Sequence, residues 1–359
     1  MKAASTKTSA AERANGMKGL MKTRTGPGFV EVRDIPEPRP GPGEVMIEVK
    51  AAGICGTDLH IWKDEYKSVP PMVMGHEGSG IIAALGEGVQ NLAVGDRVTL
   101  ETFARFCGRC FHCKQGRPNL CPERASIGTH LNGFFTKYLV IRASAVHRLP
   151  DNVSFWAGAL SEPLACCVHG ILERTPISAG DWVLVSGPGT IGLLSLQLAK
   201  ADGGKVIVLG TDKDEERLAL AKELGADEAI NVQRDNPAPT VQERTEGLGA
   251  DVAIQCAGAA ASFNQCAKLL RRGGRISQGG LFGKPVEVDL ELVAMKELEV
   301  IGFFSHVPSA WDRGLRLMGE GKVRTEPLVS HRLPLSQWQK GFELMEKGVG
   351  LKVLLTPED

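Results

Sequence analysis

The sequence predicts an α/β protein in which a doubly wound parallel sheet is joined to a mostly β domain. The chain has 359 residues, more than one hydrophobic core usually holds. Short β-type runs between glycine and proline turn signals fill its first part, and apolar runs that alternate with helical stretches fill its second part. Such alternation is typical of parallel strands joined by right-handed crossovers.

The mostly β part begins at Met17, and the chain returns to mixed character after about Ser305. A last apolar run, Leu351–Leu355, is expected to be a strand that closes back onto the first part. We therefore predict a discontinuous catalytic domain of residues 17–163 and 306–359. Its other candidate strands include Val45–Val49, Gly80–Ala84 and Arg97–Leu100.

The alternating part, residues 164–305, is predicted to be the cofactor domain. Its candidate strands are Trp182–Ser186, Lys205–Leu209, Asp251–Gln255 and Arg275–Gln278, and its candidate helices are Thr190–Ala201, Asp214–Leu224 and Ser262–Leu270.

Composition excludes some classes of partner. The chain has 42 basic and 42 acidic residues, and both signs alternate along it, whereas nucleic-acid and membrane-surface binders concentrate Lys and Arg. No run of eighteen apolar residues occurs, so no membrane span is expected. Residues 1–16 are small and polar and lack the apolar core of a secretory signal, and Glu12 argues against a transit peptide. We predict a disordered extension there and a cytoplasmic protein.

A glycine-rich turn predicts a dinucleotide site. The residues Gly187, Pro188, Gly189, Thr190, Ile191 and Gly192 follow a candidate strand and open a candidate helix. In that position the glycines of a GxGxxG pattern permit a tight turn and let backbone N–H groups approach a pyrophosphate. The second part is therefore expected to be a Rossmann domain.

Asp212 stands about twenty residues further on, after the next candidate strand, where a carboxylate accepts the ribose hydroxyls and repels a 2′-phosphate. This placement favours NAD over NADP. Lys213 and Arg217 nearby could tolerate the phosphate, and Asp212 could instead cap a helix that starts near Asp214.

Four of the nine cysteines indicate a structural zinc site in a lobe of residues 103–125. Four thiolates saturate one tetrahedral zinc and leave no position for chemistry. An iron–sulfur cluster is the alternative, because ferredoxins use similar spacing. The ligands would be Cys107, Cys110, Cys113 and Cys121.

A second metal site is suggested by the segments 53–60 and 75–78, which contain Cys55, His76 and Glu77. A thiolate, an imidazole and one or two carboxylates can hold a zinc that keeps an open position for an alcohol oxygen. Each residue alone could be an ordinary buried or hydrogen-bonded side chain.

Several motifs together resemble the zinc-containing medium-chain alcohol and polyol dehydrogenases from about Met17 to the C-terminus. They are GHEGSG at 75–80, GDRV at 95–98, the four-cysteine lobe, SEPL at 161–164, the GPGTIG turn and GLKV at 350–353. The sequence is most similar to the sorbitol (L-iditol) and threonine dehydrogenase branches, since Glu162 stands where classical alcohol dehydrogenases have a cysteine. The resemblance implies a GroES-like fold for the mostly β domain.

The resemblance also implies residue roles. Cys55 and His76 would hold the catalytic zinc, with Glu77 or Glu162 binding directly or through water. Thr57 would contact the alcohol oxygen, and His60 would be the outer end of a proton relay. Besides the glycine turn, Asp212 and Arg217, we assign to cofactor binding Cys256, Ala257, Gly258, Phe303 and Phe304.

Residues 303–306 are expected to line the substrate cleft. Where the sorbitol enzymes have an Arg-Tyr pair and a further Tyr, this chain has Ser305, His306 and Ile61. These departures leave room for a smaller diol, an amino alcohol such as threonine, or another sugar alcohol.

The predicted function is transfer of a hydride from a secondary alcohol, a polyol, diol or sugar alcohol, to NAD, giving a ketone. The enzyme would carry two zinc ions per chain and form a homo-oligomer, a dimer or tetramer. L-Threonine 3-dehydrogenase is the alternative, suggested by residues 55–61 and 339–342. A non-catalytic relative is disfavoured because Cys55, His76 and Glu162 are intact, and a zinc-finger nucleic-acid binder is disfavoured by the charge.

Overall fold

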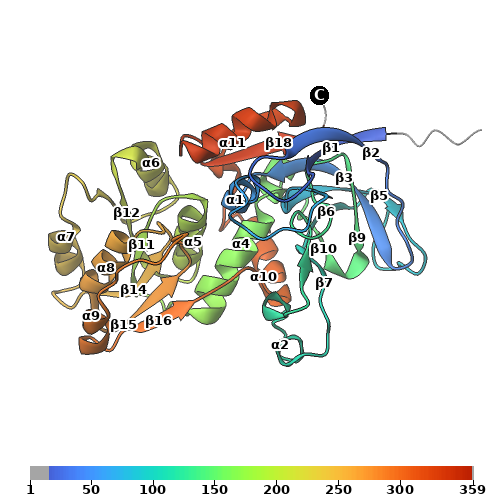
Figure 1. The fold of residues 1–359 in the computed structure, drawn as a ribbon. Helices are drawn as coiled ribbons and strands as arrows, with labels where there is room; N and C mark the ends of the chain where they lie inside the picture. Colours follow the sequence, from blue (N-terminus) through green and yellow to red (C-terminus); the bar gives the residue numbers. More distant parts are fainter. Residues whose placement is uncertain (1–15, 358–359) are drawn as a thin grey trace, which may run out of the picture.

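A computed structural model describes residues 16–357, which form two lobes side by side (Figure 1). One lobe holds β1 to β10 with β17 and β18, and the other holds β11 to β16. Residues 1–15 of the predicted extension lie outside the described residues. Gly16, which the sequence analysis assigns to that extension, is instead the first residue of β1 (Gly16–Lys22).

The second lobe is built on a six-stranded parallel sheet of order β13-β12-β11-β14-β15-β16. Counted from β11, this is the doubly wound order 3-2-1-4-5-6, whose switch point between β11 and β14 is where such sheets bind dinucleotides. The strands are β11 (Trp182–Ser186), β12 (Lys205–Gly210), β13 (Glu228–Asn231), β14 (Ala250–Gln255), β15 (Leu270–Gln278) and β16 (Glu299–Gly302). The helices are α5 (Thr190–Ala201), α6 (Glu215–Glu223), α7 (Pro237–Arg244), α8 (Ala260–Leu269) and α9 (Leu290–Met295).

The predicted elements of this lobe are confirmed with small shifts. β11 and α5 have the predicted bounds, and α6 and α8 differ from prediction by one or two residues at each end. β15 begins five residues before the predicted Arg275, because its start pairs with β14 across a register shift. Central strands such as β11 are fully buried at Val183 to Val185, as expected where both faces of a parallel sheet are covered.

The first lobe is mostly antiparallel. Its main sheet has the order β10-β6-β5-β3-β18-β17, with β9 also on β3, and smaller sheets are β2-β1-β4 and β7-β8. The remaining strands are β2 (Val30–Pro36), β3 (Glu44–Gly53), β4 (Met72–Val73), β5 (Glu77–Leu85), β6 (Arg97–Leu100), β7 (Phe103–Arg105), β8 (Ala125–Ser126), β9 (Tyr138–Arg142), β10 (Val146–Arg148), β17 (Val329–Pro334) and β18 (Lys352–Thr356). β18 pairs with β3 at Leu354 and Gly53, which confirms that the last strand closes back onto the first lobe.

Two of the helices outside the parallel-sheet lobe lie between the two lobes. In Figure 1, α4 and α10 run between the two lobes. The helices are α1 (Gly56–Trp62), α2 (Phe111–Lys114), α3 (Phe155–Gly158), α4 (Ser161–Cys167), α10 (Pro308–Gly319) and α11 (Trp338–Glu346), with a π-helix η3 (Val168–Arg174) and the 3-10 turns η1 (Pro118–Leu120), η2 (Ala143–Ala145), η4 (Asp212–Asp214), η5 (Glu326–Leu328) and η6 (Leu335–Gln337). The predicted boundary at residues 163 and 164 falls inside α4, and the division into domains stays a prediction.

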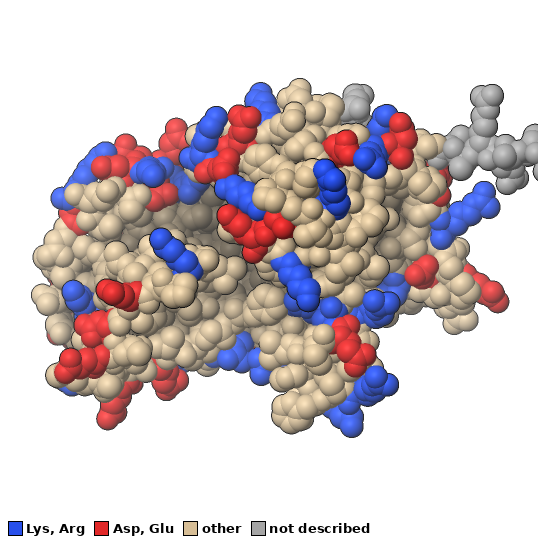
Figure 2. Space-filling model, viewed as in Figure 1, with Lys and Arg blue, Asp and Glu red and all other residues tan. Residues whose placement is uncertain are grey.

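Charged side chains of both signs are interspersed over the face shown in Figure 2, which is hollowed between the lobes. Among residues 16–357, no helix has the length and apolar character that a membrane crossing needs.

Candidate active site

The turn after β11 has the geometry of a phosphate-binding loop. Gly187 has a φ of +98°, which favours glycine, and a Cβ on Gly192 would lie 2.0 Å from Gly187 O. Helix α5 can therefore approach the strand only without a side chain there. A Cβ on Gly189 would meet nothing within 4 Å, so open space lies before the N-terminus of α5, where backbone N–H groups bind anions.

The other predicted cofactor residues surround this turn. A Cβ on Gly187 would lie 2.8 Å from the backbone N of Ala257, and Cys256 N donates to Ser186 O over 2.9 Å. Gly258, with a φ of +60°, follows them. The structure thus brings the ends of β11 and β14 together at the switch point.

Asp212 follows β12 as the sequence predicts, and its side chain is 53% exposed. Its Oδ1 accepts a hydrogen bond from Asn231 Nδ2 (2.8 Å) and lies 2.8 Å from Arg234 Nε. It does not cap α6, whose N-cap residue is Asp214, and Thr211 and Asp214 form the capping box of the preceding turn η4. The cation beside Asp212 is therefore Arg234.

The guanidinium of Arg217 is hydrogen-bonded to other parts of the chain rather than lying free beside Asp212. It donates to Asp214 Oδ1 (3.2 Å) and to the carbonyl oxygens of Gly348 (2.6 Å) and Gly350 (3.2 Å). It thus ties α6 to the loop before β18, and its assignment to cofactor binding stays a prediction.

Cys55, His76 and Glu77 each offer a ligand atom, and these atoms lie within 4.8 Å of one another. Antiparallel pairing of β3 with β5 brings Gly53 opposite Glu77, so the residues just beyond each strand end meet. Gly75, with a φ of +86°, makes the turn that leads into β5. Three donor types that suit zinc are therefore gathered by the pairing of two strands.

Glu77 is paired with Lys352, a contact that the sequence analysis missed. Lys352 Nζ lies 2.6 and 2.9 Å from the two carboxylate oxygens and also donates to Ile54 O (3.1 Å), and Glu77 is 1% exposed. Burial opposes the charge on Lys352, but the charges of Glu77 and Cys55 outweigh burial and raise the pKa of Lys352. A Glu77 that bound a metal directly would have to give up this pairing.

Glu162, at the start of α4, lines the same cavity, and no Lys, Arg or His of residues 16–357 forms an ion pair with it. Burial raises its pKa to about 7, against the opposing charges of His76 and Lys352. The thiol of Cys166, one helical turn on, donates to Glu162 Oε1 over 3.4 Å.

Two buried atoms that face each other without a hydrogen bond indicate that a cation fits this cluster. Asp58 Oδ1 and His76 Nδ1 lie 3.6 Å apart, and neither makes a hydrogen bond to a described residue, whereas Asp58 Oδ2 accepts from Cys55 N (2.9 Å). A carboxylate beside Nδ1 orients a metal-binding imidazole and leaves Nε2 for the ion. Although burial lowers the pKa of His76, Asp58 and Cys55 raise it well above its usual range. The cluster therefore favours a positive charge at its centre.

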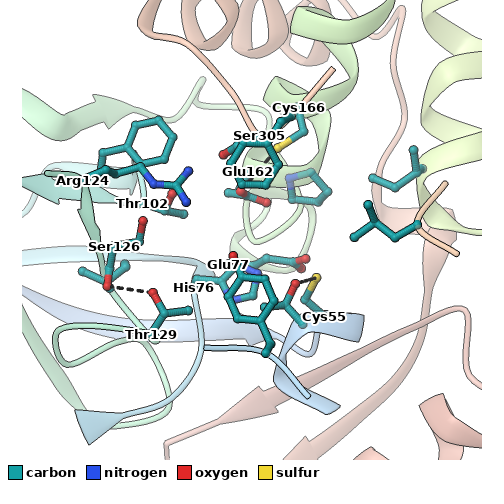
Figure 3. A pocket seen from close by; sticks show the side chains of 18 of the residues that line it. Cys55, His76, Glu77, Thr102, Arg124, Ser126, Thr129, Glu162, Cys166 and Ser305 are labelled. Carbon is teal, nitrogen blue, oxygen red and sulfur yellow. Dashed lines mark hydrogen bonds between the residues drawn. The ribbon is translucent and has the colours of Figure 1, made fainter. Parts of the chain in front are cut away.

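These groups line a cavity of about 220 Å³ between the lobes (Figure 3). Thr57 lines it too, with Oγ1 3.8 Å from Cys55 Sγ. From the second lobe it receives Ile191 of the glycine turn, Gly279, Leu281 and Phe303, and from the wall opposite it receives Thr102, Phe103, Arg124, Ser126 and Thr129. Phe304 and Ser305 also line it, as the sequence predicts, and the other lining residues are Tyr66, Ile127, Pro163 and Cys166.

Two histidines lie away from the cavity. His60 is 48% exposed, and its Nδ1 lies 2.7 Å from Glu65 Oε2, so it reaches solvent. The prediction that His306 lines the cleft is wrong. Its Nδ1 accepts from Trp311 Nε1 (3.0 Å), its Nε2 lies 3.0 Å from Thr102 Oγ1, and its ring is fully buried. Burial lowers its pKa well below the usual range, so it stays neutral and supports the cavity wall from behind.

The four lobe cysteines have the spacing of ligands around one ion. All four sulfurs lie within 4.8 Å of one another, and Cys107 Sγ is 3.6 Å from Cys121 Sγ and 3.9 Å from Cys113 Sγ. Zinc–sulfur bonds of about 2.3 Å in a tetrahedron place sulfurs about 3.8 Å apart. Hydrogen bonds from the backbone at Arg109 and Cys110 lower the pKa of Cys107 to about 7, whereas burial raises the pKa of Cys113 to about 12, so the spacing of the sulfurs carries the assignment. The lobe therefore fits a single zinc.

Comparison with known proteins identifies the family. The model of the alcohol dehydrogenase GroES-like domain matches residues 41–151, and that of the zinc-binding dehydrogenase matches residues 190–320. A sorbitol dehydrogenase of Halalkalibacterium halodurans is 44% identical over 96% of this chain and 100% of its own length. The chain belongs to the zinc-binding alcohol dehydrogenase family. The resemblance, the Rossmann and GroES-like fold class and the zinc and NAD cofactors are confirmed.

Two further relatives of this dehydrogenase are informative. A D-arabitol-phosphate dehydrogenase of Enterococcus avium is 39% identical over 96% of this chain and 99% of its own. A crystal structure of a zinc-binding dehydrogenase from Sinorhizobium meliloti bound to NADP has a TM-score of 0.87 at 32% identity and covers 96% of this chain and 100% of its own.

Asp58, Lys352, Arg124 and Arg234 were missed in the sequence analysis of this dehydrogenase. Asp58 could have been found, because it lies inside the quoted segment 53–60 and metal-binding histidines usually have a carboxylate partner. Lys352 lies in the quoted segment 350–353, but nothing local pairs it with a residue 275 positions away. Arg124 and Arg234 carry no sequence signal.

Proposed function

We propose that the enzyme oxidises a secondary hydroxyl of a polyol to a ketone, with NAD as acceptor and a zinc held by Cys55, His76 and Glu162. One observation carries the proposal: Cys55, His76 and Glu162 line the same cavity as Ile191 of the glycine turn. An alcohol in this cavity would lie beside the metal-ligating residues and beside the glycine turn at once.

The chemistry needs both groups and a path for one proton. Zinc held by Cys55, His76 and Glu162 would lower the pKa of the alcohol hydroxyl, and NAD would serve as hydride acceptor, so that the alcohol and NAD would give the ketone, NADH and one proton. Thr57, beside Cys55 at the cavity wall, is positioned to take the hydroxyl proton. His60, exposed and paired with Glu65, is positioned to release it to solvent. Phe303, half-buried at the cavity wall, would shield the reacting carbon from water.

Glu162 rather than Glu77 is the carboxylate ligand in this proposal. Both oxygens of Glu77 contact Lys352, whereas Glu162 faces the cavity with no cation within ion-pair distance among the described residues. Glu77 would then act as a buried counter-charge behind the metal.

Oxidation of L-threonine is the weaker candidate. Its ammonium group would need an anionic partner, and the two acidic side chains that line the cavity are Glu77, which is paired with Lys352, and Glu162, the proposed metal ligand. The hydroxyls of a polyol need only neutral hydrogen-bond partners, and Thr102, Ser126 and Thr129 at the cavity wall carry such groups.

The test is NADH formation with a panel of polyols, diols and L-threonine, using the wild type, Cys55→Ser and, as matched control, Cys266→Ala. Cys266 is buried in α8, outside the cavity lining. We expect a polyol to be oxidised by the wild type and the control, and Cys55→Ser to bind NAD without turnover. Turnover of L-threonine alone, or an active Cys55→Ser, would contradict the proposal.

Two further aspects belong to the same proposal: assembly as a dimer or tetramer, and a cytoplasmic location. β16 is an edge strand whose Val300 is 45% exposed, and an open edge can pair with a second copy. None of the nine cysteines forms a disulfide, as is usual in a reducing compartment. Light scattering would test the assembly, and a monomer would contradict it.

A further inference from the structure

We propose that Arg124 makes this enzyme selective for substrates that carry an oxyanion, a phosphate or a carboxylate, at the end remote from the oxidised hydroxyl. The inference rests on the proposed function. It concerns the cavity wall opposite the metal ligands, where Figure 3 shows the Arg124 guanidinium directed into the cavity, across from Cys55.

The guanidinium of Arg124 is held in place but only partly used. Nη1 donates to Asn119 O (3.1 Å), and the guanidinium carbon lies 4.8 Å from the ring centre of Phe304 and 5.4 Å from that of Phe103. Nε and Nη2 make no hydrogen bond to any described residue, and no described carboxylate forms an ion pair with Arg124. The Nε and Nη2 edge of the planar guanidinium is therefore available to bind two oxygens of an anion.

A neighbouring hydroxyl is also available. Ser126 is 9% exposed and lines the cavity beside Arg124, and within residues 16–357 its Oγ has no hydrogen-bond partner. Thr129 Oγ1, by contrast, is occupied by Ser126 O (3.2 Å) and by the ring of His130. Arg124 and Ser126 together offer three unused donors on one wall.

Two more cations strengthen the positive potential of this end of the cavity. Burial lowers the pKa of His130, and the charges of Arg124, Lys67 and Arg105 lower it further. His130 contacts Thr129 of the cavity wall, so these three cations lie near this end of the cavity. Neither Lys67 nor Arg105 is paired with a carboxylate among the described residues. Because the whole chain has no net charge, this excess is local. An anion entering the cavity would be drawn to this wall.

The position of Arg124 is fixed by the zinc lobe. Its backbone N donates to Cys121 O (3.2 Å), and Asn119, which accepts from its side chain, itself donates through Nδ2 to Phe304 O (2.8 Å). The four-cysteine segment, residues 103–125, thereby connects the cavity wall to the segment that follows β16. A preorganised cation loses less entropy on binding, so it can discriminate between substrates.

The experiment compares three substrates that share one carbon chain: a pentitol, the same pentitol with a terminal phosphate, and the acid with a terminal carboxylate. For the wild type we expect kcat/KM to be at least about tenfold higher for one anionic substrate than for the neutral pentitol, since charge-assisted hydrogen bonds are the strong class. Which anion is preferred identifies the group that the wall accepts.

Arg124→Met keeps an unbranched side chain at this position and removes the guanidinium group that lies over the two rings. We expect it to lower the ratio of anionic to neutral kcat/KM by roughly 10- to 100-fold, mainly through KM, and Arg124→Lys to retain part of the preference. The matched control is Arg109→Gln, because Arg109 is an 80% exposed arginine of the same lobe that pairs with Glu123. It should leave the ratio unchanged.

Two results would overturn the inference while the proposed function stands. One is a wild type that oxidises the neutral pentitol as efficiently as either anion. The other is an Arg124→Met enzyme whose kcat/KM falls equally for all three substrates, which indicates a structural role only. If none of the three substrates is oxidised, both the inference and the proposed function are wrong.

Discussion

Replacing Lys352 by methionine would leave Glu77 as a buried carboxylate without its cation. The structure gives this pair two contacts of 2.6 and 2.9 Å at 4% and 1% side-chain exposure, so solvent cannot take the place of the ammonium group. Breaking a buried pair by removing one partner costs about 3–5 kcal/mol. We expect a loss of about 3 kcal/mol in the free energy of unfolding, the low end of that range, because a zinc held by Cys55 and His76 partly compensates the carboxylate.

The assay is urea unfolding followed by tryptophan fluorescence at constant protein concentration. The double variant Lys352→Met with Glu77→Gln removes both charges and should recover at least half of the loss, since an isosteric neutral pair leaves no buried ion. Lys340→Met, which changes an exposed lysine of α11, should change the free energy of unfolding little. A single Lys352→Met variant within about 1 kcal/mol of wild type, or a double variant as unstable as the single one, would refute the reasoning.

Three further predictions concern the cofactor site and the four-cysteine segment, residues 103–125. Gly189→Ala should leave folding stability unchanged, because its Cβ meets nothing within 4 Å, but weaken NAD binding about tenfold by calorimetry through a clash with the pyrophosphate; unaltered affinity would show that the space is not a phosphate site. Asp212→Ala should raise KM for NAD far more than for NADP, because it releases Arg234, and equal effects would contradict the ribose assignment. Cys110→Ser should reduce the zinc content by one ion per chain, and full retention by elemental analysis would remove Cys110 from the ligand set.

The features predicted well are those whose physical cause is local. Gly187 and Gly192 allow a backbone that other residues cannot adopt, so their spacing placed β11, the turn and α5 within the sequence. The four lobe cysteines lie within fifteen residues, and their spacing alone brings the sulfurs together. The predictions from these patterns agree with the structure nearly residue by residue.

The features missed depend on contacts between distant residues. His306 was expected in the cleft, but hydrogen bonding to Thr102, 204 residues earlier, holds it behind the wall. Lys352 meets Glu77 across 275 residues through the pairing of β18 with β3. Neither strand pairing nor the packing of one lobe against the other leaves a periodic signal in the sequence, so these partners appear only in the folded chain.

Removal and return of zinc tests the central claim most directly. We expect the purified enzyme to hold about two zinc ions per chain, one in a closed site and one in an open site. Dialysis against a chelator should abolish NADH formation from a polyol while NAD binding persists, and added zinc should restore turnover. Full activity in protein that elemental analysis shows to be free of zinc would contradict the account.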